Sequence, residues 1–355
     1  MQDNLEAQRT YTLAGSSGTG KTTLSEMILF TASATNRLGS IENGNTLLDY
    51  EPEETKKGGS IQPAYATYTW EKSKHFLVDN PGDPDFLGEM PFQLKAVDGV
   101  VYVLDAVGGV KPQDKKMWKD IQKFGLPTVA VVNKMDRERA DFDQCFKGLT
   151  DVLGAKPVLL YLPIGSEAAF SGLVDILNNK ALFFKEDGTV ESGAVPEDLA
   201  GKVAELFEAT IENIAESDEA LMEKYLEEGE LTPAEIQDGL RKGILSGEVV
   251  PVCAAAAAAN KGGRQIVSII QDFLPSPLDR SPWIAEDGSE RPSSPDEPMA
   301  CFVFKTTTTP FGGQLSLLRV VSGVLVSDMV VQNPRKQSKE KMGQLQWVTG
   351  KKQEP

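Results

Sequence analysis

The residues with the clearest chemical purpose stand near the start of the chain, in the stretch Gly15-Ser16-Ser17-Gly18-Thr19-Gly20-Lys21-Thr22. This stretch fits the phosphate-loop pattern G-x-x-x-x-G-K-[ST] at every fixed position. Small residues let the backbone approach a polyphosphate with its N–H groups pointing inward, and the following helix adds its positive end. Lys21 would reach the β- and γ-phosphates, the Thr22 hydroxyl would hold Mg²⁺, and Thr23 joins the same nucleotide-binding set. A glycine and serine turn without a ligand is the alternative, and the Lys-Thr pair directly after the last glycine disfavours it.

A second motif, Asn133-Lys134-Met135-Asp136, follows the apolar run Val129–Val132, which is typical of a buried parallel strand. The pattern N-K-x-D at the end of a strand resembles the guanine-recognition motif of GTPases. The Asp136 carboxylate would accept from both N1–H and the 2-amino group of guanine, a donor pair that adenine lacks. Asn133 would connect the loops, and the Lys134 stem would cover the ring. Alone, this tetrapeptide would more often be a solvated loop, but after a phosphate loop it predicts GTP or GDP.

A third segment, Asp79-Asn80-Pro81-Gly82, follows Phe76–Val78. Asp79 at the end of a buried strand matches the Mg²⁺-facing carboxylate of phosphate-loop enzymes, and Gly82 would offer a backbone N–H near the γ-phosphate. Asn-Pro-Gly would form a turn whatever its function. The two interpretations are compatible, because the switch segment of a GTPase is itself a turn.

The elements that position these motifs alternate between strand and helix over residues 1–155, which predicts an α/β fold with a mostly parallel sheet. An acidic helical region interrupts the alternation, which then resumes. We therefore predict a phosphate-loop GTPase domain made of residues 1–155 and 246–279, with an inserted acidic α+β subdomain at 156–245. The expected strands are Thr10–Ala14, Val100–Leu104 and Val249–Val252, and the expected helices are Thr22–Ala32, Pro112–Phe124 and about Gly263–Phe273.

The acidic region spans residues 186–238 and carries 17 Asp and Glu against two Lys. Apolar residues recur there at helical spacing, which predicts an amphipathic helix with an acidic outer face. A solvated helix face is the default interpretation of such a run, and docking to a basic partner is the functional one. The apolar positions are Leu199, Val203, Leu206, Phe207, Ile211 and Ile214.

Composition limits the class of protein. A chain of 355 residues is long enough for two or three domains with cores of their own. A net charge of −16 argues against binding DNA or RNA through a broad basic surface, although a local patch could still dock on an RNA–protein particle. No apolar run has the length of a membrane span, and the scattered Cys145, Cys253 and Cys301 have no metal-ligand spacing. We expect a cytoplasmic protein in a reducing environment.

The C-terminal part is different in character. Residues 280–298 are rich in proline, serine and acid, a linker composition, and from Ala300 the chain becomes rich in strand signals. Residues 299–355 predict the start of an antiparallel β-barrel with too few strands to close, so we expect the N-terminal part of a longer protein. The expected strands are Cys301–Phe304, Leu315–Val321, Leu325–Val326 and Met329–Val331.

Over nearly its whole length the sequence resembles the translation elongation factor G family. The resemblance implies binding of GTP or GDP with Mg²⁺, hydrolysis of GTP and a conformational cycle on the ribosome. It also implies that a monomer contacts ribosomal RNA, and that its acidic insertion contacts the ribosomal stalk protein. The segments that carry it, beyond the general GTPase motifs, are Glu42–Thr46, Asp49–Glu54, Leu104–Val107, Gly109–Gln113, Asn133–Arg137, Leu162–Gly165, Leu221–Leu226 and Phe304–Thr306.

One departure from the family concerns the chemistry directly. Members commonly have a histidine after the switch glycine to orient the attacking water, and here that position is Asp83. The single histidine, His75, lies on the preceding strand and cannot substitute. A carboxylate could accept a proton from water, but nearby phosphate charge should raise its pKa and oppose its approach. We take Lys21, Gly82 and Asp83 as the candidate catalytic residues.

Two other motifs also depart from the family. The first switch usually reads R-G-I-T-I and here reads Lys57-Gly58-Gly59-Ser60-Ile61, so the Ser60 hydroxyl joins Thr22 and Asp79 as a candidate metal ligand. The guanine loop that often reads Ser-Ala is Ala256-Ala257, which keeps the backbone N–H for guanine O6 and loses the hydroxyl. These departures predict a paralogue. Three functions stay open: a ribosome-associated GTPase, a GTP-binding switch or ribosome-binding module with little hydrolysis, and a ribosomal protection factor.

Overall fold

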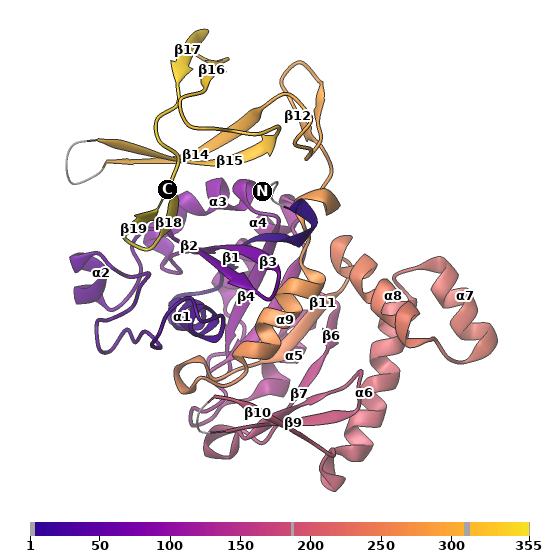
Figure 1. The fold of residues 1–355 in the computed structure, drawn as a ribbon. Coiled ribbons are helices and arrows are strands. Elements are labelled where there is room, and N and C mark those ends of the chain that lie inside the picture. The colour runs from indigo at the N-terminus through magenta and orange to yellow at the C-terminus, as the bar shows by residue number, and fades with distance from the viewer. Residues whose placement is uncertain (1–3, 186–187, 309–312, 355) are drawn as a thin grey trace.

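A computed structural model describes residues 4–185, 188–308 and 313–354 (Figure 1). Its centre is a seven-stranded sheet in the order β2-β3-β1-β4-β5-β11-β6. Only β2 runs antiparallel to its neighbour β3, so the predicted mostly parallel sheet is confirmed. The strands are β1 Gln8–Ala14, β2 Ala64–Trp70, β3 Ser73–Asp79, β4 Gly99–Asp105, β5 Thr128–Asn133, β6 Pro157–Leu159 and β11 Val250–Ala254.

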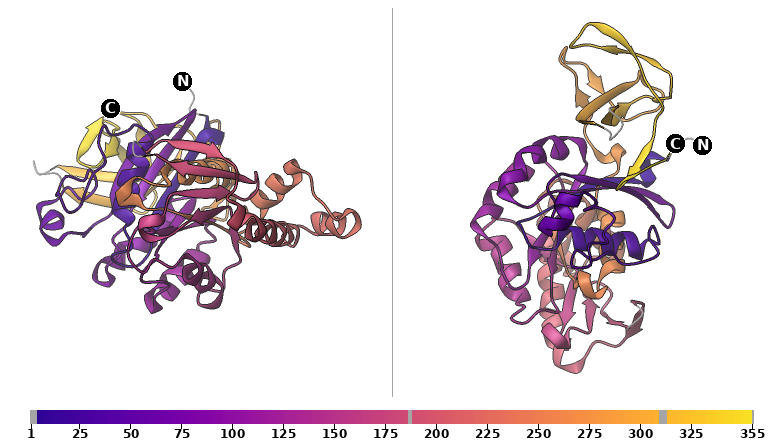
Figure 2. Two further views of the ribbon diagram at one scale, coloured as in Figure 1. Left: turned by 90° about the horizontal axis from the view of Figure 1, so that it is seen from below. Right: turned by 90° about the vertical axis from the view of Figure 1, so that its left-hand side faces the viewer.

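Helices cover both faces of this sheet, which explains why β4, β5 and β11 are buried along their whole length. Figure 2 shows α3, α4 and α5 on one side of the sheet and α1 and α9 on the other. The α1 and α9 backbones approach closely at Gly263, where a Cβ atom would lie 2.4 Å from Thr31 Oγ1. The helices of this domain are α1 Lys21–Thr31, α2 Pro52–Lys57, α3 Met90–Ala96, α4 Pro112–Lys123, α5 Phe142–Asp151 and α9 Gly263–Phe273, with short 3-10 turns η1 Leu5–Ala7, η2 Pro84–Glu89, η4 Ala257–Ala259 and η5 Pro277–Asp279.

The inserted unit has its own antiparallel sheet in the order β10-β9-β8-β7, followed by three helices. Because β6 pairs with β11 in the central sheet, the inserted sheet starts at β7, a few residues after the predicted boundary at 156. The predicted amphipathic helix is confirmed as α6, which buries Val203, Ile211 and Ile214. The elements are β7 Tyr161–Ile164, η3 Glu167–Ala169, β8 Gly172–Asp175, β9 Lys180–Phe184, β10 Val190–Gly193, α6 Glu197–Ala215, α7 Glu219–Glu228 and α8 Pro233–Leu245.

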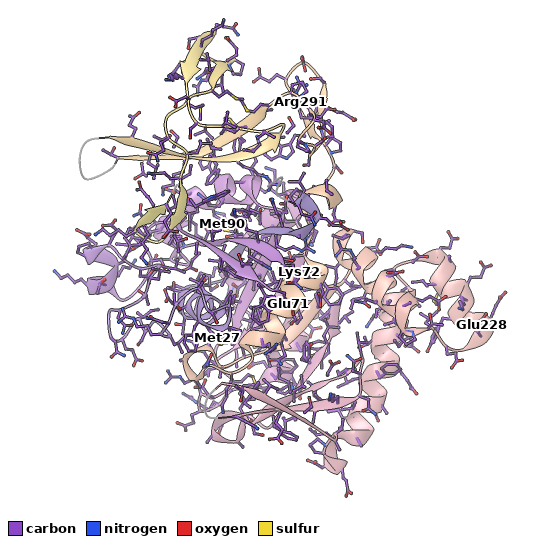
Figure 3. The ribbon with its side chains drawn as sticks, in the orientation of Figure 1. Met27, Glu71, Lys72, Met90, Glu228 and Arg291 are labelled. Carbon is purple, nitrogen blue, oxygen red and sulfur yellow. The ribbon has the colours of Figure 1, made fainter. Side chains whose placement is uncertain are left out.

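The inserted helices project away from the central sheet. Figure 3 places Glu228 of α7 at their outer end, far from Glu71 and Lys72 in the β2–β3 turn. Within the described part of the chain, no helix is both long enough and apolar enough to cross a membrane.

The predicted linker at 280–298 contains a small hairpin, β12 Trp283–Ile284 and β13 Glu290–Arg291. Its turn is Asp287-Gly288, and Gly288 adopts φ +81°, as such turns require. The expected strand at Leu325–Val326 is wrong, because the chain turns at Gly323 (φ +67°) and again at Asp328 (φ +64°). The other C-terminal strands are β14 Ala300–Thr308, β15 Gln314–Ser322, β16 Val330–Asn333, β17 Ser338–Lys341, β18 Trp347–Thr349 and β19 Lys352–Glu354.

The C-terminal strands contact the first domain at the edge of its sheet (Figure 1). The Gly350 N–H donates to Tyr65 O at 2.8 Å, and the Thr67 N–H donates to Thr349 Oγ1 at 3.2 Å. A second contact between the two parts joins β15 to the residue before β4: Arg319 forms an ion pair with the buried Asp98 at 2.8 Å. The end of the chain therefore covers the outer edge of β2.

Candidate functional site

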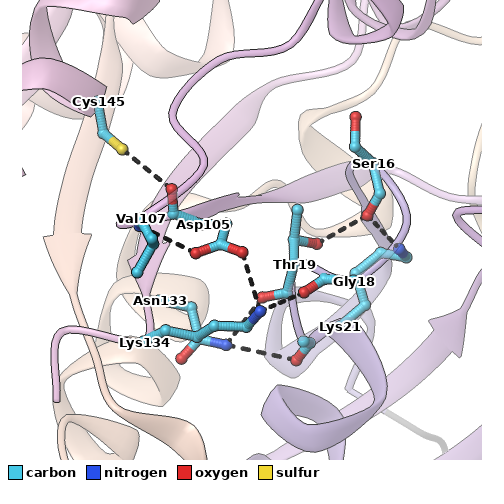
Figure 4. A network of polar contacts seen from close by, with 10 residues as sticks. Ser16, Gly18, Thr19, Lys21, Asp105, Val107, Asn133, Lys134 and Cys145 are labelled. Carbon is cyan, nitrogen blue, oxygen red and sulfur yellow. Dashed lines mark hydrogen bonds and ion pairs between the residues drawn. The ribbon is translucent and has the colours of Figure 1, made fainter. Parts of the chain in front are cut away.

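The phosphate loop connects β1 to α1, and its backbone closes around the Lys21 side chain (Figure 4). The Lys21 ammonium donates to Gly15 O at 2.9 Å and to Ser16 O at 3.1 Å. Gly20, with φ +88°, allows the loop to enter α1, and a Cβ atom there would lie 2.5 Å from Asn133 Nδ2. Burial lowers the pKa of Lys21 to about 8, while the charges of Asp79 and Asp114 oppose that shift. The loop thus holds a buried cation beside the N-terminus of a helix, a suitable environment for phosphate.

A buried carboxylate on α4 braces this loop from behind. Ser16 Oγ donates to Asp114 Oδ1 at 2.5 Å, and the Tyr102 hydroxyl donates to the same oxygen at 2.8 Å. The other oxygen accepts from the Lys111 N–H at 2.6 Å. Asp114 belongs to none of the sequence motifs that predict the site. An acid in the first turn of a helix indicates only a favourable interaction with the helix dipole.

Two hydroxyls and two carboxylates meet beside Lys21. Thr22 Oγ1 lies 3.0 Å from Ser60 Oγ. Asp79 and Asp49 are almost wholly buried, and within the described residues none of their four carboxylate oxygens has a hydrogen-bond partner. Burial, reinforced by the charge of Asp49, raises the pKa of Asp79 to about 7, and burial raises that of Asp49 to about 6. The nearby hydroxyls of Thr22 and Ser60 oppose these two shifts only in part.

This set of oxygen donors fits Mg²⁺. Magnesium prefers carboxylate, hydroxyl and water oxygens, and buried carboxylates without partners need a compensating positive charge. Thr22, Ser60 and Asp79 were predicted from the sequence, whereas Asp49 was named only as part of a family motif. The charge coupling between Asp49 and Asp79 adds Asp49 to the site.

Two other buried carboxylates hold the first switch segment in place. Glu26 on α1 accepts from the N–H groups of Leu47 at 2.7 Å and Leu48 at 3.0 Å. Glu54 on α2 accepts from the N–H groups of Ile61 at 2.9 Å and Gln62 at 3.2 Å. The chain is therefore fixed just before Asp49 and just after Ser60.

The second switch segment, residues 79–89, approaches the phosphate loop at Gly82. A Cβ atom there would lie 2.1 Å from Lys21 Nζ and 2.8 Å from Gly15 O, so only glycine brings the backbone this close. Asp83 directs its side chain elsewhere: it accepts from Lys57 Nζ at 2.7 Å and from the Asp85 N–H at 3.1 Å. The Lys57 hydrogen bond, followed by that of Asp85, lowers the pKa of Asp83. The protein groups around Asp83 thus make it a weaker base than an ordinary aspartate.

At the other end of the site, Asn133 connects two loops as predicted. Its Nδ2 donates to Thr19 O at 3.0 Å, and its Oδ1 accepts from the Ala257 N–H at 3.0 Å. The Ala256 N–H donates to Lys261 O at 3.1 Å. The two amides expected to reach guanine O6 are therefore already hydrogen-bonded to the protein.

Lys134 lies extended along the base-recognition end (Figure 4). Its ammonium contacts Gly18 O and forms an ion pair with Asp105 at 2.9 Å. Burial alone would raise the pKa of Asp105, but Lys134 and the Val107 N–H lower it below its usual value. The half-buried Asp136 carboxylate accepts no hydrogen bond from any described residue, so its oxygens are available to a ligand.

The structure brings the predicted residues together at the carboxyl ends of β1, β3 and β5, where open α/β sheets bind ligands. Ser17 and Gly18 form the exposed tip of the loop, and Thr23 is half-buried in the first turn of α1. His75 lies away from this edge, fully buried and stacked on Tyr68 with ring centroids 4.6 Å apart.

Residues 6–276 match the sequence family described as "Elongation factor Tu GTP binding domain". Among solved structures, the fold is similar to the crystal structure of a protein from Thermus thermophilus, with a TM-score of 0.88 and 29% sequence identity. The match covers 99% of this chain and 50% of that one, so the chain spans about half the length of this relative.

Proposed function

Since the chain belongs to the family of elongation factor Tu GTP-binding domains, we propose that it is a ribosome-associated GTPase of the elongation factor G type. It would bind GTP and GDP with Mg²⁺ and hydrolyse GTP to drive a conformational cycle. The observation that carries this proposal is the pair of buried, unpartnered carboxylates Asp49 and Asp79 beside the phosphate-loop Lys21. Such a site is stable in its ionised form when a cation compensates its charge, and Mg²⁺ bound with a polyphosphate beside Lys21 would supply that charge.

At the metal and phosphate end of the site, each residue would have a separate role. Thr22, Ser60 and Asp79 would hold Mg²⁺, with Asp49 facing the same ion, and the ion would neutralise charge on the β- and γ-phosphates. Lys21 would exchange its bonds to Gly15 O and Ser16 O for phosphate oxygens. Gly82 would present its N–H to the γ-phosphate, because its backbone already lies against Lys21.

Selection of guanine would rest on Asp136, with Lys134 covering the ring and Asn133 holding the surrounding loops together. Because the Ala256 and Ala257 N–H groups are engaged with Lys261 O and Asn133 Oδ1, these two residues would shape the pocket wall around O6. The remaining loop positions, Gly15 to Thr19 and Thr23, would surround the phosphates.

The inserted helices provide the candidate docking surface. The α6–α8 region projects from the domain and carries most of the acidic excess, which suits a basic partner (Figures 1 and 3). We propose contact with the ribosomal stalk protein there, and with ribosomal RNA through local patches elsewhere. The protein would act as a cytoplasmic monomer, without binding DNA or membrane.

Asp83 supports a second candidate, a GTP-binding switch with little hydrolysis. It stands where the family commonly has histidine, and its bond to Lys57 makes it a poor proton acceptor. Ribosome-stimulated GTP turnover by the full-length protein and its Asp83→His variant decides between the two. Turnover near background that the variant restores would favour the switch. Substantial wild-type turnover is the result we expect, and it would exclude the switch.

A further inference from the structure

The two switch segments are joined directly by one ion pair. Lys57, the last residue of α2, contacts Asp83 at 2.7 Å, and its ammonium also lies 4.1 Å from the ring centroid of Phe86. Asp83 is the N-cap of η2, and its other oxygen accepts from the Asp85 N–H at 3.1 Å. A side chain of the first switch segment is thus held by two groups of the second.

This pair closes a ring of contacts around the phosphate end of the site. Ser60 contacts Thr22 on α1, and Gly82 lies against Lys21 at the start of the same helix. Between Ser60 and Gly82, the Lys57–Asp83 pair connects the first segment to the second. Every contact in the ring is made by protein groups, with Lys21 and Thr22 buried and the Lys57–Asp83 pair partly exposed.

We propose that Lys57 is a positioning residue for the proposed hydrolysis, holding Asp83 so that this residue links the two switch segments across the phosphate site. The inference rests on the proposed function for its effect on turnover. The contribution of Asp83 to turnover is then the link itself, and proton acceptance from water is not part of it.

The exposure of the pair suits a link that opens and closes. The side chains of Lys57 and Asp83 are 38% and 29% exposed. Ion pairs at such positions contribute modestly to stability, and the aromatic face of Phe86 adds a comparable attraction. The link is therefore strong enough to bias the two segments and weak enough to break within a catalytic cycle.

Hydrogen exchange in the protein without added nucleotide tests the link by a double-mutant cycle. Lys57→Met and Asp83→Asn each remove the pair, and asparagine keeps the cap on the Asp85 N–H. We expect amides of residues 51–62 and 80–89 to exchange about threefold faster than the wild type in each single variant. The double variant should exchange no faster than either single variant, because the same pair is lost in all three. Lys56→Met, which removes a neighbouring exposed charge from the same helix, should exchange like the wild type. Additive effects, or no effect, would overturn the link.

Ribosome-stimulated GTP turnover by the full-length protein tests its role in the reaction. We expect kcat to fall about threefold in Lys57→Met, in Asp83→Asn and in the double variant, with KM within about twofold of the wild type, and Lys57→Arg to keep full turnover. If Asp83 instead accepts the proton, Asp83→Asn will lower kcat strongly even in the Lys57→Met background, and the proposal fails. If the wild type neither binds nor hydrolyses GTP, the proposed function fails on its own, while the exchange cycle still decides whether the link exists.

Discussion

The two ends of the nucleotide site differ in how far the protein itself satisfies their polar side chains. At the guanine end, Asn133 is hydrogen-bonded on both sides of its amide and Lys134 is paired with Asp105. At the metal end, Asp49 and Asp79 are buried, and their oxygens have no partner within the described residues. At the base-recognition end, Asn133 and Lys134 are already satisfied by the protein and the Asp136 carboxylate is left open to a ligand, whereas the metal end places like charges together and needs a cation.

This difference indicates which part of the site can respond to the nucleotide. A hydrogen-bonded set such as that around Asn133 gains little by rearranging, because each broken bond leaves a buried polar group unsatisfied. The carboxylates at the metal end gain a partner when Mg²⁺ and phosphate arrive, so their segments change in stability on binding. We expect the guanine end to act as a fixed holder and the metal end, with its switch segments, to act as the sensor.

The largest test of the comparison removes the cation of the phosphate end. Lys21→Ala should weaken GDP and GTP binding about 1000-fold, because charge-assisted bonds to two phosphates are lost. Titration with a fluorescent guanine nucleotide measures this, and Lys115→Ala, which removes an exposed lysine of α4, is the control. An affinity of Lys21→Ala within about tenfold of the wild type would mean that the guanine end holds the nucleotide by itself.

The next test acts on the guanine end alone. Asp136→Asn should reduce the preference for GTP over ATP about 100-fold, since a carboxylate that accepts from two guanine donors is replaced by an amide. Competition of the two nucleotides for one site gives the ratio, with Asp198→Asn on the remote helix α6 as the control. An unchanged ratio would remove Asp136 from base recognition.

A third test uses pH to compare the ends. The pKa values of Asp49 and Asp79 are raised in the folded protein to about 6 and about 7, from 3.8 in an unperturbed aspartate. The folded state therefore binds more protons than the unfolded chain between about pH 4 and pH 7. The stability that these two carboxyl groups contribute is fully present below this window, and it is lost as the pH rises through their pKa values in the folded protein. Denaturant unfolding without Mg²⁺ should show a loss on the order of 2 kcal/mol from pH 6 to pH 8.

Variants and ligand sharpen that measurement. Asp79→Asn removes one titrating carboxylate, so it should flatten the curve, and saturating Mg²⁺ with GDP should flatten it by favouring the ionised form. Asp136→Asn changes a carboxylate at the guanine end and should leave the slope unchanged. A wild-type curve without slope would mean that the two buried carboxylates are not neutralised in the folded protein.

The smallest expected effect concerns the brace behind the phosphate loop. In Asp114→Asn, the amide can accept through only one atom, so Ser16, Tyr102 and the Lys111 N–H cannot all keep their acceptor. We expect GDP to dissociate about tenfold faster, with an unchanged preference for guanine over adenine. Stopped-flow release of a fluorescent nucleotide measures this. Equal release rates in Asp114→Asn and wild type would mean that the hydrogen bonds of Asp114 do not hold the phosphate loop.

Much of the site could be predicted because its residues belong to short sequence motifs at the ends of strands. The phosphate loop, Asp79 and Asn133 each stand at or directly after the end of a strand, so predicting the strand also places the side chain at the ligand-binding edge of the sheet. The Ser16–Asp114 bond could not be predicted this way, because it joins residues 98 positions apart and belongs to no local motif. The role of Asp49 also depends on tertiary burial beside Asp79, which the sequence does not show.

The two places where the predicted fold differs from the structure also have local causes. The hairpin of residues 283–291 lies in a region whose composition predicts a linker, and its strands of two residues each are too short to show alternation, although Asp287-Gly288 is a turn signal. At Leu325–Val326 the apolar pair resembles a strand, but the turns at Gly323 and Asp328 interrupt the chain on both sides. Apolar residues between two closely spaced turns are too few to extend a ladder.

The covered edge of β2 has a consequence for solubility. An unpaired strand edge offers free amide and carbonyl groups on which a second molecule can add its own strand. The contacts from Thr349 and Gly350 to Thr67 and Tyr65 occupy that position, and Trp347 shields Phe76 with ring centroids 5.4 Å apart. The last β-hairpin thus protects the GTPase sheet against intermolecular strand addition, and a shortened chain ending near residue 280 would expose both the edge and the aromatic ring to self-association.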